Sequence, residues 1–426
     1  MPQSAPTWVG ELDRTAELTD LAVDPTYTAA RLLVTSHGTP LGLVELPLVD
    51  GRASAVQVDA AVRSRFGDDE DPPRPPVSDE PLTVVIATRG RAASLERCVR
   101  AVLAGAHPGV TVLVVDNDPA DDATAEAVAR IADGRVRYVC EPRRGASVAR
   151  NRGLREATTA LVAFTDDDTE PDRCWAARIA GAFATDPDVA CVSGPVLAAR
   201  LATPEQRAAD AALAWNKGFT ARRFSLAEPP RDSPIFPFSP GLFGIGANLA
   251  VRADVVRVVG GYDEALGPGT PTHGGEDCEL MVRFVLAGHV VAYVPGAYVW
   301  HHHRPSAAAL RLQVRGYATG LGGFLAKVAL DPTARAAALR RVPAALARLR
   351  HIAKRETGAG MPSCAGRQRL RGLLLGPVLY LRARRAVRRA GGQVPPLVPC
   401  SGDRPGGADA DGPGANGPPV HLVAAS

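Results

Sequence analysis

Three consecutive aspartates, Asp166, Asp167 and Asp168, directly follow an apolar run in the segment LVAFTDDDTEPD, residues 161–172. Adjacent carboxylates repel one another unless a cation or protons offset their charge. Oxygen ligands of this kind suit Mg²⁺ or Mn²⁺, and such an ion, held by few side chains, commonly bridges to a substrate phosphate. The alternative is an acidic turn in solvent that also caps the next helix. The triplet alone favours neither.

A second acidic pair, Glu276 and Asp277, follows two glycines in THGGEDCEL, residues 272–280. Acidic side chains are common in the first turn of a helix because they interact favourably with the helix dipole. The same dipole lowers their pKa, so a general base at this place needs burial or charged neighbours to restore its basicity. Taken alone, the pair favours a plain helix start over a catalytic base.

Three histidines follow an apolar segment in VWHHHR, residues 299–304. If the strand continues through them, His301 and His303 lie on one face and His302 on the other. Neutral imidazoles two residues apart are a feasible pair of metal ligands. The alternative is a polar strand end with surface histidines, which three histidines in a row make weaker.

From Leu82 onward, apolar runs alternate with helical patterns, and these elements must position the polar residues. The runs LTVVIAT, VTVLVVDND, VRYVCE and ALVAFTDDD are typical of strands covered on both faces. Alternation of this kind predicts a doubly wound α/β fold with a mainly parallel sheet, which binds ligands beyond the carboxyl ends of its strands. Asp116 and the aspartate triplet fall at such ends. The first strand continues into TRGRAAS instead of GxGxxG, which argues against a dehydrogenase.

Composition divides the 426 residues into five parts. Residues 1–70 form a small α+β unit whose two strands are joined by a turn, and the proline-rich residues 71–81 form a linker. Residues 82–330 hold the predicted sheet. Residues 331–390 form a basic helical region, and residues 391–426, rich in Gly, Pro and Asp, are expected to be a disordered tail.

Basic charge is concentrated in the C-terminal region. Between Arg335 and Arg389 the sequence holds fifteen Lys or Arg and one acid, Glu356, although the net charge of the chain is only +4. A basic amphipathic helix can lie on an anionic membrane surface, and a helical subdomain with a solvated basic face is the slightly favoured alternative. No reading helix, aromatic platform or zinc pattern accompanies the charge, so we expect no nucleic-acid partner.

Cysteine usage and hydropathy indicate a cytoplasmic protein. The seven cysteines lie far apart and form no CxxC pair, which suits reduced thiols. We find neither a signal-peptide pattern nor a run of the roughly 18 apolar residues that a spanning helix needs. Contact with the inner face of the membrane is expected only as a peripheral association.

Taken together, the motifs resemble the family 2 inverting glycosyltransferases of the GT-A fold. The resemblance covers about residues 80–310, and the motifs occur in the order typical of the family: VVIATRGR, VVDND, GASVARNRGL, FTDDDTEP, GIGANLAVR, GGYDEALGPG, GGEDCELMVR and VWHHHR. It implies that Asp166 and Asp168 are the aspartates of a DxD motif, which hold Mg²⁺ or Mn²⁺ against the diphosphate of a nucleotide sugar. His301 or His303 would complete that site.

The same resemblance assigns the remaining site residues. On the donor side it implies nucleotide contacts for a set of polar residues: Thr88, Arg89, Asp116, Arg150, Asp166 and Asp167. It matches Asp277 to the general base that deprotonates an acceptor hydroxyl, with Glu276 beside it. Gly246, Ala247 and Asn248 match a small-residue segment that lines the sugar or acceptor pocket.

The resemblance implies a UDP-sugar as the favoured donor and a saccharide, lipid-linked or small-molecule acceptor. The first strand departs from the family pattern because it ends in IATRGR and lacks the aromatic residue that stacks on the base, so thymidine and guanosine donors stay open. The expected product is a surface polysaccharide, a glycolipid or a glycosylated metabolite. Two other hypotheses are a nucleotidyltransferase and a non-catalytic scaffold that binds nucleotide sugars.

Overall fold

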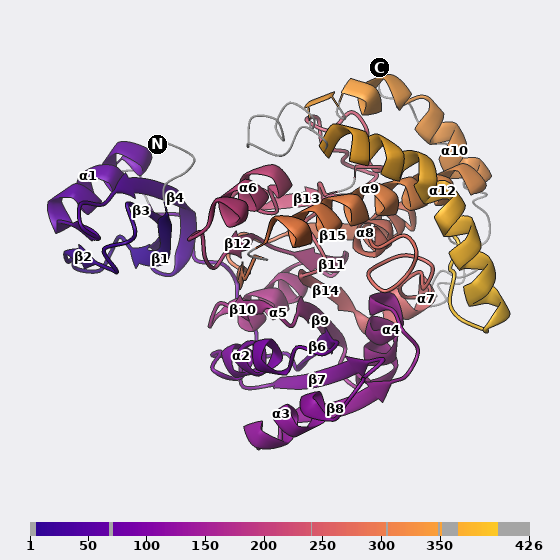
Figure 1. The fold of residues 1–426 in the computed structure, drawn as a ribbon, viewed down its shortest axis with the longest axis horizontal. Helices are drawn as coiled ribbons and strands as arrows, with labels where there is room; N and C mark the ends of the chain where they lie inside the picture. Colours follow the sequence, from indigo (N-terminus) through magenta and orange to yellow (C-terminus); the bar gives the residue numbers. More distant parts are fainter. Residues whose placement is uncertain are drawn as a thin grey trace, which may run out of the picture.

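A mixed sheet of eight strands forms the centre of the molecule in the computed structural model (Figure 1), which describes residues 6–67, 71–239, 241–303, 306–347, 350–351 and 365–398. The strand order is β13-β15-β11-β14-β9-β6-β7-β8. The strands are β6 (Leu82–Thr88), β7 (Val110–Asn117), β8 (Val136–Glu141), β9 (Leu161–Asp166), β11 (Val189–Ser193), β13 (Arg222–Phe224), β14 (Asn248–Arg252) and β15 (Val290–Tyr293). Pairing is parallel among β6 to β9 and between β11 and β15, and antiparallel at β14 and β13. The predicted α/β fold with a mainly parallel sheet is confirmed.

Helices cover both faces of this sheet, as the continuous apolar runs predict. Val85 packs into a core with α4 and α8, whereas its neighbours Val84 and Ile86 pack into a second core with α2 and α5. Side chains on both faces of β6 are therefore covered by protein, which is why apolar and polar residues do not alternate along this strand. The flanking helices are α2 (Ala92–Leu103), α3 (Ala123–Ile131), α4 (Ala146–Glu156), α5 (Trp175–Thr185), α7 (Ala253–Val258) and α8 (Glu276–Leu286).

Gly153 allows α4 to lie directly on the sheet. A Cβ at this position would come 2.3 Å from Cγ1 of the fully buried Val85. We therefore expect Gly153→Ala to lower the free energy of unfolding by about 1–3 kcal/mol, because overpacking displaces well-packed neighbours. Urea unfolding measures the change. Gly134→Ala is the matched control, since a Cβ there meets nothing within 4 Å, and an equal loss in both variants would contradict this account.

Two segments that look like single strands in the sequence are each broken in the structure. The run VACVSGPVLAA forms β11 and then β12 (Val196–Ala198), and HVVAYVPGAYVW forms β15 and then β16 (Val299–His301). Both breaks fall at a Gly and Pro pair, where the chain leaves the central sheet. The second halves join β10 (Thr169–Pro171) in a small sheet of order β10-β16-β12. This sheet brings His301 opposite Thr169, next to the aspartate triplet.

The N-terminal unit holds two small sheets, of three and two strands, and lies to one side of the central domain (Figure 1). It comprises β1 (Thr7–Asp13), β2 (Leu21–Ala22), β3 (Ala29–Ser36), β4 (Thr39–Pro47), β5 (Arg52–Ala53) and α1 (Ala55–Phe66). The predicted turn is present, since His37 and Gly38 both have positive φ between β3 and β4. The unit is anchored through polar contacts: Tyr298 donates to Glu11 at 2.9 Å, and Arg31 pairs with Asp210 of α6 (Pro204–Leu213) at 2.5 Å.

Helices form the C-terminal part of the chain; the first lies within residues 82–330, which the sequence assigns to the sheet domain, and the other two lie in the predicted basic helical region. They are α9 (Ala307–Leu330), α10 (Pro332–Leu339) and α12 (Ala365–Arg389), and α12 crosses α9 where Gly372 and Gly376 meet Ala318 and Gly322. Within the described ranges, no helix is both long and apolar enough to cross a membrane. Of the tail predicted from residue 391, residues 391–398 are described and include the buried Leu397, whereas residues 399–426 lie outside the described residues. The five composition-based boundaries stay predictions.

Candidate active site

A cleft of about 640 Å³ opens at the carboxyl ends of β6, β7 and β9, where the strand order predicts a ligand site. Thr88, Asn117 and Asp166 line it from the strand ends, and α9 closes the opposite side. Six Arg or Lys side chains also line the cleft: Arg89, Arg91, Arg144, Arg150, Lys217 and Arg369. Cationic groups around a cleft that also holds carboxylates suit a ligand with both phosphate and hydroxyl groups.

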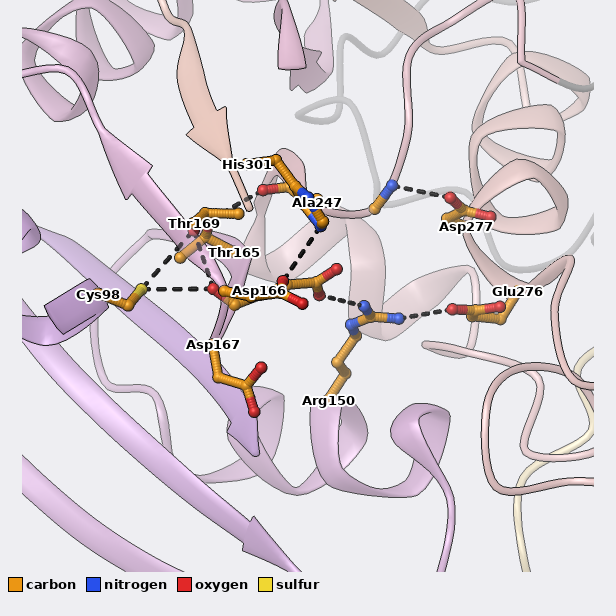
Figure 2. A network of polar contacts seen from close by, with 12 residues as sticks. Cys98, Arg150, Thr165, Asp166, Asp167, Thr169, Ala247, Glu276, Asp277 and His301 are labelled. Atoms are coloured by element: carbon orange, nitrogen blue, oxygen red, sulfur yellow. Dashed lines mark hydrogen bonds and ion pairs between the residues drawn. The ribbon is translucent and has the colours of Figure 1, made fainter. Parts of the chain in front are cut away.

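The three aspartates have different surroundings. The carboxylate of Asp166 accepts from Arg150 at 3.0 Å, and that of Asp168 accepts from Arg91 at 3.0 Å. The side chain of Asp167 points away from Asp166 (Figure 2), and Thr88 and Arg91 each donate to it at 2.7 Å. Burial raises the pKa of Asp167 to about 6, although the Arg91 guanidinium lowers it. These hydrogen bonds anchor the loop, and Asp167 also lines the cleft, so its predicted donor contact stays a prediction.

Asp166, Asp168 and His301 form a group that could hold a cation, with ligand atoms all within 4.8 Å of one another. Nε2 of His301 lies 3.1 Å from Oδ1 of Asp168. Burial lowers the pKa of His301, but the Asp168 carboxylate more than offsets this and leaves the pKa above its usual value. In the part of the chain that the structure describes, the buried Nδ1 of His301 has no hydrogen-bond partner. Two carboxylates and one imidazole fit Mg²⁺ or Mn²⁺ and leave coordination positions for a substrate.

His303 does not join this group, contrary to its prediction as a metal ligand. The strand ends at His301, and Nε2 of His303 faces Asp210 at 3.6 Å instead. Both rings pack against Trp215, with centroid distances of 4.7 Å for His301 and 4.9 Å for His303. The two histidines therefore share one side, as the sequence predicts, but only His301 reaches the aspartates.

Arg150 links the two acidic groups of the cleft. Its buried guanidinium donates to Asp166 at 3.0 Å and to Glu276 at 2.7 Å (Figure 2), and its Cζ lies over the ring of Tyr262, 5.5 Å from the ring centroid. Burial raises the pKa of Glu276, the neighbouring Asp277 raises it further, and Arg150 acts in the opposite direction. This ion pair fixes the start of α8 relative to the end of β9.

Asp277 and Glu276, which both line the cleft, differ in the groups that hold their carboxylates. Asp277 lines the cleft, and its two oxygens accept one backbone N–H each, from Gly246 and Cys278, both at 2.7 Å. Each carboxylate oxygen has a second lone pair that can accept a further hydrogen bond. Glu276 is 5% exposed and bound to Arg150, so its geometry suits a positioning role more than proton transfer.

Glycines bring the helices and loops around Asp277 together. Gly275, with φ +92°, precedes α8, and a Cβ there would come 2.8 Å from the carbonyl oxygen of Gly320 on α9. A Cβ at Gly246 would lie 3.0 Å from Cβ of Asp277. The double glycine before Glu276 thus lets α9 approach the start of α8.

Two predicted donor contacts, Asp116 and Arg89, and one predicted pocket contact, Asn248, bind protein groups in the structure. Asp116 is fully buried and accepts from Tyr138 at 3.1 Å, and burial raises its pKa. Arg89 lines the cleft but pairs with Asp118 at 2.9 Å. Asn248 is buried and saturated, because it donates to the carbonyls of Pro195 and Ala297 and accepts from Trp175. Asn248 therefore holds two loops together, and Gly246 and Ala247 are the members of its segment that line the cleft.

Arg91 is the functional candidate that sequence reasoning missed. It offsets the charge of two aspartates at once, with bonds of 2.7 Å to Asp167 and 3.0 Å to Asp168. Its only signal in the sequence is its place in TRGR, directly after the first strand. The other basic cleft residues that were not predicted lie in segments without a recognisable motif: Arg144, Lys217 and Arg369.

Comparison with known proteins defines the class. Residues 83–234 match the family described as "Glycosyl transferase family 2", and residues 161–379 match "Glycosyl transferase family group 2". The second match covers more than half of the chain. The chain therefore belongs to the family 2 glycosyl transferases, as the resemblance implies.

Individual relatives share parts of this chain. It is 33% identical over 235 residues to the "Pre-mycofactocin glycosyltransferase" of Mycobacterium tuberculosis, covering 54% of this chain and 45% of that protein. It is 27% identical to "Glycosyltransferase AglE" of Haloferax volcanii, covering 55% and 71%. The chain thus spans about half the length of the mycobacterial relative.

Solved structures show weaker similarity. The mannosyltransferase PcManGT from Pyrobaculum calidifontis, in complex with GDP-Man and Mn²⁺, aligns with a TM-score of 0.45 and 20% identity over 78% of this chain and 94% of that one. GalNAc-T7 with UDP, GalNAc and Mn²⁺ aligns with a TM-score of 0.40 and 18% identity over 60% and 51%.

Proposed function

We propose that this protein is a metal-dependent inverting glycosyltransferase that moves a sugar from a nucleoside-diphosphate donor, preferentially a UDP-sugar, to an acceptor hydroxyl. One observation carries the proposal: the group of Asp166, Asp168 and His301 lines the same cleft as Asp277. Arg150 and Glu276 connect the two ends of that cleft through a buried ion pair. A donor bound at the first end would present its sugar toward the second.

In this proposal Asp166, Asp168 and His301 hold Mg²⁺ or Mn²⁺. When bound, the ion neutralises charge on the departing nucleoside diphosphate. Arg91 and the other basic side chains that line the cleft offset the remaining phosphate charge, and Arg150 keeps Asp166 in place. These groups are already positioned by protein contacts, so little reorganisation is needed when the donor binds.

Asp277 takes the proton from the acceptor hydroxyl in the proposed reaction. Asp277 lines the cleft and its carboxylate can accept a further hydrogen bond, while its bonds to Gly246 and Cys278 fix its orientation. The deprotonated oxygen attacks the anomeric carbon from the face opposite the diphosphate, and a single displacement inverts that centre. We assign Glu276 a positioning role through Arg150.

The proposed acceptor belongs to a surface polysaccharide, a glycolipid or a glycosylated metabolite. We place the reaction in the cytoplasm, at or near the inner face of the membrane. The charge of the C-terminal helices supports that location, since α12 carries eight arginines and no acid.

The test is slow donor hydrolysis in the absence of an acceptor. A panel of nucleotide sugars is incubated with the protein and Mg²⁺ or Mn²⁺, and release of nucleoside diphosphate is measured. We expect release from one donor, abolished by chelation and reduced at least about 100-fold in Asp168→Asn, because the metal contributes several kcal/mol to leaving-group stabilisation.

Asp121→Asn is the matched control, since Asp121 is an exposed acid outside the cleft that bonds only its own turn. This variant should hydrolyse the donor at the rate of the original protein. No release across the panel, together with no metal-dependent nucleotide binding, would overturn the proposal and favour a non-catalytic scaffold.

A further inference from the structure

A second groove, of about 410 Å³, lies between α9 and α12 next to the cleft. Three arginines line it: Arg311 and Arg315, one turn apart on α9, and Arg371 on α12. Leu312 lines both the groove and the cleft, so the two spaces adjoin. Gly372 forms part of the floor, where the two helices are in close contact.

The charge of this groove is not neutralised by the protein that the structure describes. None of Arg311, Arg315 and Arg371 forms an ion pair with a described acid, although exposed arginines elsewhere, such as Arg63 and Arg100, do. Asp331 is the sole acid among the described residues from 306 onward. Three unneutralised guanidinium groups around one concavity favour a ligand with a compact negative charge, and phosphate is such a ligand because its oxygens accept paired hydrogen bonds from guanidinium groups.

An apolar surface continues from the groove along α12. Leu370 and Leu374 are 60% and 69% exposed, and Val378 and Leu381 follow on the same helix face at spacings of four and three residues. Leu375 in the groove and Leu312 beside it are also exposed. Five arginines border this face: Arg371, Arg382, Arg385, Arg388 and Arg389. A helix that exposes leucines beside arginines is typical of one that lies in a membrane interface.

We propose that the groove between α9 and α12 binds the phosphate of a lipid-borne acceptor while the apolar face of α12 rests on the membrane. This inference rests on the proposed function, because it supplies the acceptor for the cleft. The phosphate would sit among Arg311, Arg315 and Arg371, and the group to be glycosylated would pass Leu312 toward Asp277. The position of Arg315 supports this path, since burial lowers the pKa of His273 at the cleft and the charge of Arg315 lowers it further.

The experiment is vesicle flotation of the full chain. Neutral phosphatidylcholine vesicles are doped either with a polyprenyl phosphate or with phosphatidylglycerol at equal total charge. We expect about tenfold tighter binding to the polyprenyl phosphate vesicles, because phosphatidylglycerol presents a more hindered phosphate diester. The triple variant Arg311→Gln/Arg315→Gln/Arg371→Gln should lose that preference.

Arg382→Gln/Arg385→Gln/Arg388→Gln is the matched control, with the same loss of charge on α12 outside the groove. It should bind both vesicles more weakly and keep the preference for polyprenyl phosphate. Equal effects of the two triple variants on the preference would overturn the site and leave only general attraction to a charged surface. Binding of millimolar inorganic phosphate to the groove without any preference for polyprenyl phosphate vesicles would also overturn it, since the groove would then take free phosphate rather than a lipid.

Two further measurements separate the remaining outcomes. Leu370→Ser/Leu374→Ser should weaken binding to every vesicle; a dimer in vesicle-free solution that this variant abolishes would instead assign the apolar face to a second copy of the chain. Donor hydrolysis by the original protein, measured without lipid, tests the proposed function on its own. Hydrolysis without lipid preference overturns only this inference. Lipid preference with neither hydrolysis nor metal-dependent nucleotide binding overturns the proposed function and, with it, the role of the bound lipid as acceptor.

Discussion

Asp277→Asn is expected to reduce sugar transfer by about 10²–10⁴-fold, the range that a positioned general base contributes. The same variant should retain donor hydrolysis, since the metal group of Asp166, Asp168 and His301 is untouched and water replaces the acceptor. Asp168→Asn should lose both reactions. The measurement is transfer to acceptor and release of nucleoside diphosphate in parallel, with the metal in excess.

The substitution also affects one hydrogen bond, which requires a structural control. Asp277 accepts from the backbone of both Gly246 and Cys278, and an asparagine keeps one of these acceptors. Nucleotide binding and the unfolding midpoint of Asp277→Asn should therefore stay close to those of the original protein. Transfer at the original rate would show that another group removes the proton, and a parallel loss of nucleotide binding would show that Asp277 is mainly structural.

The sheet and the position of the cleft could be predicted from the sequence because both depend on local patterns. Continuous apolar runs such as LTVVIAT need cover on both faces, and the structure supplies it with α2 and α5 on one side and α4 and α8 on the other. Asp166 and Asp168 come together with a histidine because β16 pairs with β10 directly after the triplet. The order of these segments along the sequence already favours a metal group made of the aspartates and a histidine.

The roles of single polar residues could not be predicted, because they depend on contacts between distant segments. Asn248 appears as a pocket residue in its motif, yet it is saturated by Trp175, Pro195 and Ala297. The ring of His303 faces Asp210, which lies 93 residues earlier in the sequence. Arg91 has no distinctive pattern, and only the fold brings it to the triplet. The local sequence predicts the position of a polar residue within its own helix or strand. It does not predict which distant residues form hydrogen bonds or ion pairs with that residue.

A buried charge network shows the same dependence on distant contacts and has the largest expected effect on stability. Nζ of Lys327 on α9 lies 2.7 Å from Asp263 and 2.7 Å from Glu279 of α8, and all three side chains are at most 5% exposed. Arg283 pairs with Glu279 at 2.6 Å, and Tyr380 of α12 donates to Asp263 at 2.9 Å. The two positive and two negative charges of this network thus offset each other. The contacts also join α8, α9 and α12, the helices that surround Asp277 and the groove.

Lys327→Met is expected to lower the free energy of unfolding by about 3–5 kcal/mol, because removing one partner leaves an uncompensated buried carboxylate. Urea unfolding followed by circular dichroism measures the loss. The surface variant Arg63→Met, which breaks an exposed pair with Asp59, should cost about 0.5 kcal/mol or less.

The double variant Lys327→Met/Asp263→Asn restores the charge balance and should recover part of the stability, since the amide oxygen introduced at position 263 can still accept from Tyr380. If Lys327→Met were no more destabilising than Arg63→Met, the network would not hold these helices together. If the double variant were less stable than Lys327→Met, charge balance would not be the reason for the loss.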